Sequence, residues 1–170
     1  KENVDDNAFT NYMAYWNIEK AVEYCEYLKA NKKEIYERLD SCLDLTAAYT
    51  EWLDKKDKIY LPKARKEDGV IPQDKTYLTL ENIDLTKYKK QEQVGTMFFD
   101  YNLEQVNKIQ VSKQADIMIL FFLLEGRFSL DVKRANWNYY EPRTLHDSSL
   151  SLSTHCVLAS DMGDRTMAYD

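Results

Sequence analysis

The chain has 170 residues, a formal net charge of −6 at pH 7 and a sequence pI near 5.1, as for one acidic domain. This charge argues against a general nucleic-acid-binding protein, because affinity for polyanions depends on phosphate neutralisation by Lys and Arg. Four Gly and three Pro leave few obligatory turns, so the composition favours an all-α fold and makes an all-β fold unlikely.

Cysteine usage and hydropathy bear on the location of the protein. Cys25, Cys42 and Cys156 are an odd number at irregular spacings, so we expect reduced thiols and a cytoplasmic protein. The most apolar run, residues 117–124, is far shorter than the ~20 residues that span a bilayer, which predicts a buried helix and no membrane partner. The polar opening "KENVDDN" has neither an initiating Met nor the pattern of a signal peptide, so the chain resembles an internal portion of a longer protein.

The first half of the chain predicts helices followed by a long irregular region. Apolar residues at spacings of three and four predict a helix over residues 8–30. A second helix is expected over residues 31–55, and the cap-type residues of "DSCLD" at 40–44 could break it in two. Periodicity then fails over residues 56–102, where we expect turns and short extended pieces. A segment of this length usually carries function or packs over a site.

The second half returns to helical periodicity. Ser129 is a predicted N-cap, and Pro142 is a predicted stop signal. The expected helices cover residues 103–124, 129–140 and 148–162, and a further helix begins after Gly163.

The segment 143–149 is the first candidate site. Its polar residues precede a predicted helix, where free backbone N–H groups and the helix dipole favour an anion. The composition alone favours a simpler interpretation, in which Asp147 or Ser148 caps the helix and His146 is an ordinary surface residue.

Two other chemistries for this segment are disfavoured. His146, Asp147 and Ser148 are consecutive, whereas the base of a catalytic triad must bridge two partners on opposite sides. A metal site that uses His146, His155, Cys156 and Asp161 lacks standard ligand spacing, so no metal is expected.

Lys113, Gln114 and Glu2 are further candidates. Lys113 and Gln114 are polar residues just ahead of the most apolar run, where long side chains can line a pocket. Glu2 is a carboxyl that leads into an aromatic-rich helix, and such surroundings can produce a general acid. Taken alone, Lys113 and Gln114 are more typical of a helix face that is solvent-exposed at one end, and Glu2 is only a charged residue at the terminus.

Four segments taken together resemble the catalytic domain of glycoside hydrolase family 65, the inverting disaccharide phosphorylases of maltose, trehalose, kojibiose and nigerose. They are "ENVDDNAFTNYMAYW", "VSKQADIMILFFLL", "KRANWNYYEPRTLHDSSLS" and "GDRTMAYD". The resemblance extends from the first residue to the last. It implies that residues 1–170 are the second half of an (α/α)6 toroid, a catalytic-domain fragment truncated at both ends, and that the full-length protein is a homodimer.

The resemblance also implies roles for the candidate residues. Glu2 matches the general acid that protonates the glycosidic oxygen, although a second Glu is expected just upstream of Lys1 and could be the acid instead. Lys113 and Gln114 match the pair that binds sugar. The loop that receives inorganic phosphate is matched by His146, Ser148 and Ser149, with Arg143 and Thr144 as weaker candidates.

The implied reaction is inverting phosphorolysis of an α-glucosyl disaccharide to β-glucose 1-phosphate and a free sugar. Phosphate is the nucleophile, so the general base of an inverting hydrolase is not required. No cofactor is expected, and inorganic phosphate is a co-substrate. A carboxylate at Asp147 would repel phosphate, so we expect Asp147 to point away from it, to cap the helix or orient a neighbour. His155 is expected to be structural.

Two alternatives remain open. An inverting α-glucosidase of the same family could use Asp147 as its base. A non-catalytic helical piece is the second alternative, since half a barrel lacks half its pocket. We also expect the 170-residue chain alone to aggregate, because helices of a toroid bury their apolar faces against neighbours.

Overall fold

A computed structural model describes residues 4–91 and 93–169 of the protein. The chain divides into two compact units, each described here by itself. The three-helix unit is Thr10–Leu61, and the site unit is Lys1–Phe9 together with Pro62–Asp170. Within the described residues, no helix combines the length and the apolar character needed to cross a membrane.

The three-helix unit contains most of α1 (Ala8–Asn31), with α2 (Lys33–Leu43) and α3 (Leu45–Lys56). Its buried core is formed by Cys25, Tyr36 and Leu45. The predicted first helix is confirmed, and the expected break in the second falls at Asp44. Asp44 has a left-handed backbone with φ 51°, which ends α2, and its side chain accepts a hydrogen bond from Ala47 N at the start of α3.

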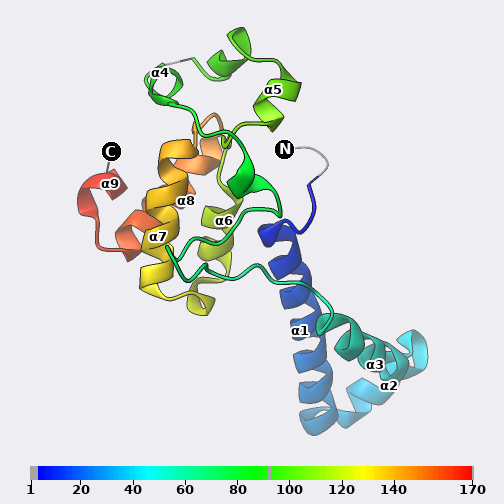
Figure 1. Cartoon of the computed structure of the whole chain (residues 1–170). Coiled ribbons are helices and arrows are strands. Elements are labelled where there is room, and N and C mark those ends of the chain that lie inside the picture. Colours follow the sequence, from blue (N-terminus) through cyan, green and yellow to red (C-terminus); the bar gives the residue numbers. More distant parts are fainter. Residues whose placement is uncertain (1–3, 92, 170) are drawn as a thin grey trace. The chain divides into compact units, whose positions relative to one another are not determined.

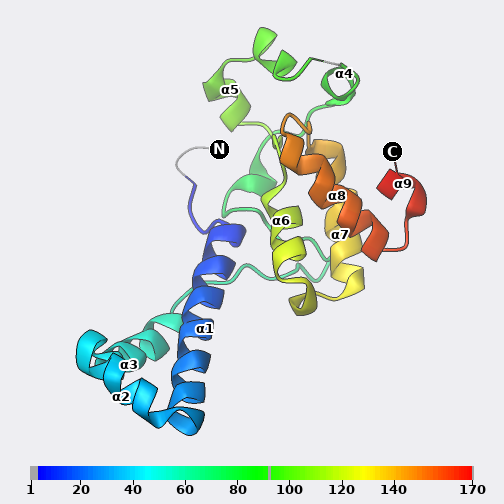
Figure 2. The same ribbon diagram turned by 180° about the vertical axis from the view of Figure 1, so that it is seen from behind.

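The site unit is built on α6 (Asp116–Leu123), α7 (Leu130–Tyr140) and α8 (Ser149–Asp161), and α9 (Arg165–Tyr169) packs on α8. Figures 1 and 2 show α6 beside both α7 and α8 from opposite sides. Ile117, Leu120 and Phe121 of α6 are almost fully buried, as are Tyr140 of α7 and Leu158 of α8. The apolar run is therefore a core helix, as predicted.

The segment between the two helical regions is irregular, as expected for residues 56–102. Its regular pieces are single turns or little more: η1 (Tyr77–Thr79), α4 (Thr86–Lys89) and η2 (Thr96–Phe99). These pieces, with the short α5 (Leu103–Asn107), enclose a small core of Leu85, Met97, Ile109 and Val111.

The predicted helix over residues 103–124 is wrong. The structure has α5, then a non-helical stretch from 108 to 115, then α6. The stretch hydrogen-bonds across the chain instead of within a helix: Gln110 N donates to Glu81 O at 2.7 Å, and Ser112 N donates to Arg143 O at 2.9 Å. These tertiary bonds satisfy the backbone and override the local helical pattern.

The later helix boundaries agree closely with the sequence. Ser129 caps α7, since its Oγ accepts from Val132 N. After α7 one turn of 3₁₀ helix, η4 (Glu141–Arg143), carries Pro142, and a similar turn, η3 (Glu125–Arg127), follows α6. The described residues contain isolated bridges but no named strand, so the all-α class is confirmed.

Candidate active site

A cavity of ≈ 390 Å³ in the site unit is a candidate ligand site, because it has the volume of a small-molecule pocket and the predicted Lys113 and Gln114 line it. Lys113, Gln114, Asp74 and Asp147 contribute polar groups to its lining. The apolar part of the lining comes from η2 and α5, with Met97, Phe98, Leu103 and Val106. Such a combination of apolar walls and a few polar groups is typical of pockets that orient a small ligand.

A two-residue bridge joins the two segments that carry the candidate residues. Ser112 N donates to Arg143 O, and Leu145 N donates to Ser112 O, both at 2.9 Å, which makes a parallel pairing of Ser112 with Thr144. Thr144 is fully buried, and its Oγ1 donates to Tyr140 O at 2.9 Å. This pairing holds the residues after Ser112 and the residues after Thr144 against the same cavity.

Asp74 is a buried carboxylate in the lining of this cavity. Its Oδ1 accepts hydrogen bonds from Thr76 N, Thr76 Oγ1 and Tyr77 N at 2.8–2.9 Å. Its Oδ2 has no hydrogen-bond partner among the described residues, although Asp74 is only 1 % exposed. An unpaired buried oxygen is costly, which makes Asp74 an unusual polar group in this lining.

The N-terminal segment closes another side of the cavity. Asn7 Nδ2 donates to Asp116 Oδ2 at 3.0 Å, and Ala8 N donates to Gln73 O at 2.8 Å. These four residues belong to the site unit, and Asn7, Gln73 and Asp116 line the cavity. The predicted general acid, Glu2, lies outside the described residues.

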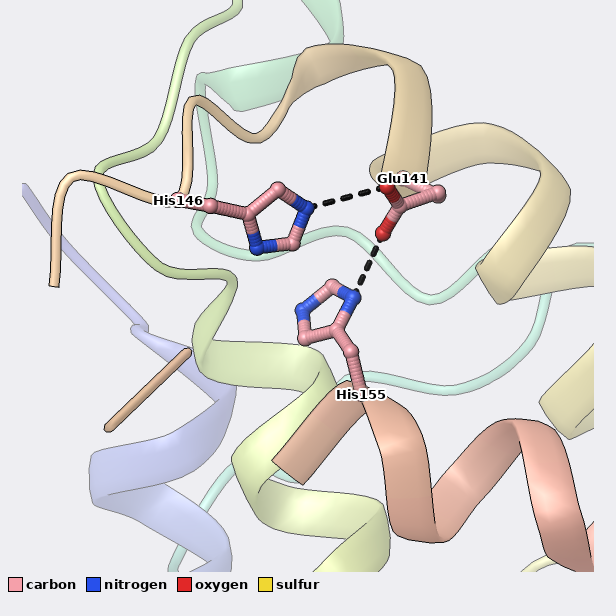
Figure 3. A group of neighbouring side chains, drawn as sticks. All are labelled: Glu141, His146 and His155. Atoms are coloured by element: carbon pink, nitrogen blue, oxygen red, sulfur yellow. Dashed lines mark hydrogen bonds and ion pairs between the residues drawn. The ribbon is translucent and has the colours of Figure 1, made fainter. Parts of the chain in front are cut away.

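A second polar cluster lies beside the loop that precedes α8. Figure 3 shows the rings of His146 and His155 converging on the carboxylate of Glu141. Glu141 Oε1 is 2.9 Å from His146 Nε2, and Glu141 Oε2 is 2.5 Å from His155 Nδ1. All three side chains are largely buried, with 17 % or less of each exposed.

Charge and hydrogen bonds keep Glu141 ionised. Burial raises the pKa of its carboxyl, but hydrogen bonds from His146 and His155 and the positive charge of Lys89 more than offset burial, so the pKa lies well below its ordinary value. Lys89 Nζ is 3.2 Å from Glu141 Oε1 and donates to Glu141 O at 2.6 Å.

The donor set of Glu141, His146 and His155 has the spacing of a metal site, since the three ligand atoms lie within 4.8 Å of one another. Lys89 already supplies a positive charge to the same carboxylate oxygen, and the two imidazoles bond to that carboxylate directly. A cation would have to displace these contacts. The arrangement fits a hydrogen-bonded network better than a metal centre.

The structure separates the residues of the predicted phosphate loop. Both ring nitrogens of His146 have protein partners, because Nδ1 lies 2.9 Å from Ser151 Oγ. His146 lines a second hollow with Glu141 and His155, and does not contribute to the described lining of the 390 Å³ cavity. Arg143 donates from Nε to Gln110 Oε1 at 3.1 Å and from Nη1 to Tyr139 O at 2.6 Å.

Ser148, Ser149 and Asp147 differ in their surroundings. Ser148 is the N-cap of α8, with its Oγ accepting from Leu150 N at 3.4 Å, so of the two expected caps, Asp147 and Ser148, the structure has Ser148. Asp147 instead lines the cavity with Lys113 and Gln114. Ser149, the first residue of α8, is exposed. His155, expected to be structural, is buried and bonded to Glu141.

Sequence reasoning missed Asp74 and Glu141. Asp74 stands in a segment without periodicity, and only the folded chain shows that one of its oxygens is unpaired. Glu141 lies next to a helix-stopping proline, five residues before His146 and fourteen before His155. The turn of η4 that brings it to both rings has no sequence signal beyond that proline.

Comparisons with known proteins point in one direction. The family model described as the glycosyl hydrolase family 65 central catalytic domain matches residues 1–170. The chain is 40% identical over 169 residues to the kojibiose phosphorylase of Halothermothrix orenii, covering 99% of this chain and 21% of that protein. It is 34% identical over 167 residues to the alpha,alpha-trehalose phosphorylase of Thermoanaerobacter brockii, covering 98% of this chain and 21% of that protein.

A solved structure agrees with these relatives. The structure described as a kojibiose phosphorylase from the human microbiome has a TM-score of 0.77 and 27% sequence identity, covering 97% of this chain and 22% of that one. The chain therefore spans about a fifth of the length of the curated relatives that it matches.

Proposed function

The chain belongs to the central catalytic domain of glycosyl hydrolase family 65, and from this membership we propose that the whole protein cleaves an α-glucosyl disaccharide by inverting phosphorolysis. The products are β-glucose 1-phosphate and a free sugar. The observation that carries the proposal is the Ser112–Thr144 bridge, which aligns the two candidate segments beside one cavity of ligand size.

Lys113 and Gln114 bind the sugar in this proposal. Both line the cavity, and between them they offer a cation, an amide donor and an amide acceptor for hydroxyl groups. Asp147, which also lines the cavity, accepts hydrogen bonds from other hydroxyls of the sugar. With Asp147 used in this way, its negative charge lies on the sugar side of the site.

The start of α8 receives phosphate in this proposal. Ser148 and Ser149 supply hydroxyl and backbone groups at the N-terminus of a 13-residue helix, where the helix dipole favours an anion. His146 lies two residues before this terminus and contacts phosphate through Nδ1 after exchanging its contact with Ser151. Arg143 and Thr144 hold the loop from behind through the bonds described above.

Glu2 is the proposed general acid, with a glutamate upstream of Lys1 as the alternative. The acid protonates the glycosidic oxygen while phosphate attacks the anomeric carbon from the opposite face, which inverts its configuration. Because phosphate is already anionic, no general base is required. We propose further that the reaction uses no metal or organic cofactor, and that the whole protein is a cytoplasmic homodimer.

The proposal is tested with the purified whole protein on a panel of α-glucosyl disaccharides, with and without inorganic phosphate. We expect β-glucose 1-phosphate to form only when phosphate is present. Equal release of glucose without phosphate would instead identify the hydrolase alternative, with Asp147 as the candidate base. Failure to cleave any α-glucosyl disaccharide under either condition would favour the non-catalytic alternative.

Replacing Lys113 extends this test to the sugar side of the site. Lys113→Met removes a charged donor from the cavity while keeping a long side chain, so the KM for the disaccharide should rise about 10- to 100-fold. Lys90→Met, at an exposed lysine that is not part of the described cavity lining, is the matched control and should leave KM unchanged. Equal effects of the two substitutions would remove Lys113 from the sugar site.

A further inference from the structure

The carboxylate of Glu141 contacts both histidines of the chain. Neither the family resemblance nor the cavity assigns a role to Glu141. We propose that Glu141 is a positioning residue for phosphate binding, which acts by fixing the ring of His146 and the loop that leads into α8. This inference rests on the proposed function, since it assigns Glu141 to the phosphate side of that reaction.

The carboxylate of Glu141 determines which nitrogen of His146 carries a proton. An ionised carboxylate only accepts hydrogen bonds, so the facing Nε2 of His146 must be the donor. Nδ1 then faces Ser151 Oγ, which is almost fully buried and can donate or accept. The ring is consequently fixed in one orientation from both sides. Nδ1, which carries no proton when Nε2 carries it in a neutral ring, can exchange Ser151 Oγ for the hydroxyl group of hydrogen phosphate and accept its hydrogen bond.

The backbone of His146 also needs this support. Its φ of 57° places it in the left-handed region, which is unfavourable for a residue with a Cβ and persists only when surrounding contacts maintain it. Ser148, two residues after His146, is the N-cap of α8. A loop that relaxes at His146 would therefore shift Ser148 and Ser149, the other residues proposed to contact phosphate.

Glu141 is itself held on three sides, as a positioning residue requires. Lys89 of α4 donates to both its backbone oxygen and its carboxylate. His155 of α8 donates from Nδ1 to Oε2, and its ring packs edge-on against that of His146 with centroids 4.6 Å apart. The Nε2 of His155 is buried without a hydrogen-bond partner among the described residues.

The test is Glu141→Gln in the whole protein, with steady-state phosphorolysis measured against each substrate. The amide keeps the size of the side chain but places an NH₂ group opposite one of the two imidazole N–H groups, so the network cannot form as it stands. We expect the KM for inorganic phosphate to rise about 10- to 100-fold, the equivalent of a lost charge-assisted hydrogen bond. The KM for the disaccharide should rise by less than the KM for phosphate, because Lys113 and Gln114 of the proposed sugar site lie outside the loop that Glu141 holds.

Two controls separate positioning from loss of stability. Tyr140→Phe removes the buried hydrogen bond from Tyr140 Oη to Ile71 O, next to Glu141 but outside the network, and should leave the phosphate KM unchanged. The double variant E141Q/H146N should be no worse for phosphate than H146N alone, because Glu141 acts through His146. If E141Q does not fold, Glu141→Asp tests the same point, since its shorter carboxylate keeps the charge but cannot reach both rings.

The outcomes distinguish this inference from the proposed function. A wild-type protein that shows no phosphate-dependent cleavage overturns the proposed function and this inference with it. A wild-type phosphorylase whose E141Q variant, or E141D variant, keeps the wild-type phosphate KM overturns the inference alone. Additive effects of E141Q and H146N, or an equal rise in phosphate KM in Y140F, would also overturn it.

Discussion

At the scale of single residues, Glu141 shows how a buried charge is made stable. Three donors from different parts of the site unit surround it: Lys89 from α4, His146 from the loop before α8, and His155 from α8. A buried carboxylate with one of these partners alone would be costly, whereas the complete network satisfies both of its oxygens. Removing one partner should therefore also change the contacts that the other two make with Glu141.

The depressed pKa of Glu141 predicts how acid affects stability. Below the ordinary pKa of 4.5, the unfolded chain takes up a proton that the folded protein does not, so ionised Glu141 stabilises the fold less and less. The loss from this one group approaches about 1.4 kcal/mol per pH unit. In the unfolded chain the histidines are already protonated between about pH 5 and pH 3. Their proton uptake in the unfolded chain therefore does not change across this window.

The measurement compares Tm for wild type and Glu141→Gln across this window. Wild type should be the more stable protein at about pH 5, and the difference in Tm should shrink as the pH falls toward about 3. A buffer series at constant ionic strength controls for screening of surface charges. A difference in Tm that stays constant or widens on acidification would contradict the assignment of an ionised Glu141.

The sequence predicted only some of the residues of the candidate site. Lys113 and Gln114 could be selected from the sequence, and the structure places both on the cavity. Asp74 and Glu141 could not, because their significance depends on an unpaired oxygen and on contacts with residues up to 52 positions away. Spacing along a chain carries no signal for such contacts.

At the scale of elements, the helix starts were predictable and the stretch ahead of α6 was not. Ser129 and Ser148 are local signals, since a cap bonds to a backbone N–H two or three residues ahead. Residues 108–115 instead pair with Glu81 and with Arg143 to Leu145, and alternating apolar residues there fit a helical periodicity by coincidence. Only tertiary structure could identify that stretch as the element that positions Lys113 and Gln114.

Substitutions at the two serine caps, Ser148 and Ser129, provide a matched test of the proposed phosphate site. Ser148→Ala and Ser129→Ala each remove an Oγ that accepts a backbone N–H at 3.4 Å, so each should cost about 1 kcal/mol of stability. Only Ser148 lies in the proposed phosphate loop, so only S148A should raise the KM for inorganic phosphate. Thermal melting and phosphate titrations on both variants of the whole protein check this. Equal phosphate kinetics in the two variants would contradict a phosphate site at the start of α8.

At the scale of the whole molecule, the class of fold followed from composition and the family from four long segments. Few glycines and prolines allow long helices, and the described residues are mostly helical with no named strand. The chain nevertheless leaves much apolar surface uncovered. Large exposed side chains on α6 and α8 include Phe122 at 45%, Leu123 at 49%, Leu150 at 69% and Leu152 at 59%.

This surface predicts that the isolated 170-residue chain associates with itself. Leu150 and Leu152 lie exposed near the start of the 13-residue α8, and exposed apolar patches drive association in water. The mass of the purified chain, measured by light scattering after gel filtration, should therefore rise with protein concentration. The double variant Leu150→Gln with Leu152→Gln should shift the chain toward monomer, whereas Leu43→Gln, at a 63% exposed leucine of the three-helix unit, should have the smaller effect. A wild-type chain that stays monomeric at all concentrations and melts cooperatively would contradict this expectation, because it would mean that the exposed leucines of α8 need no cover.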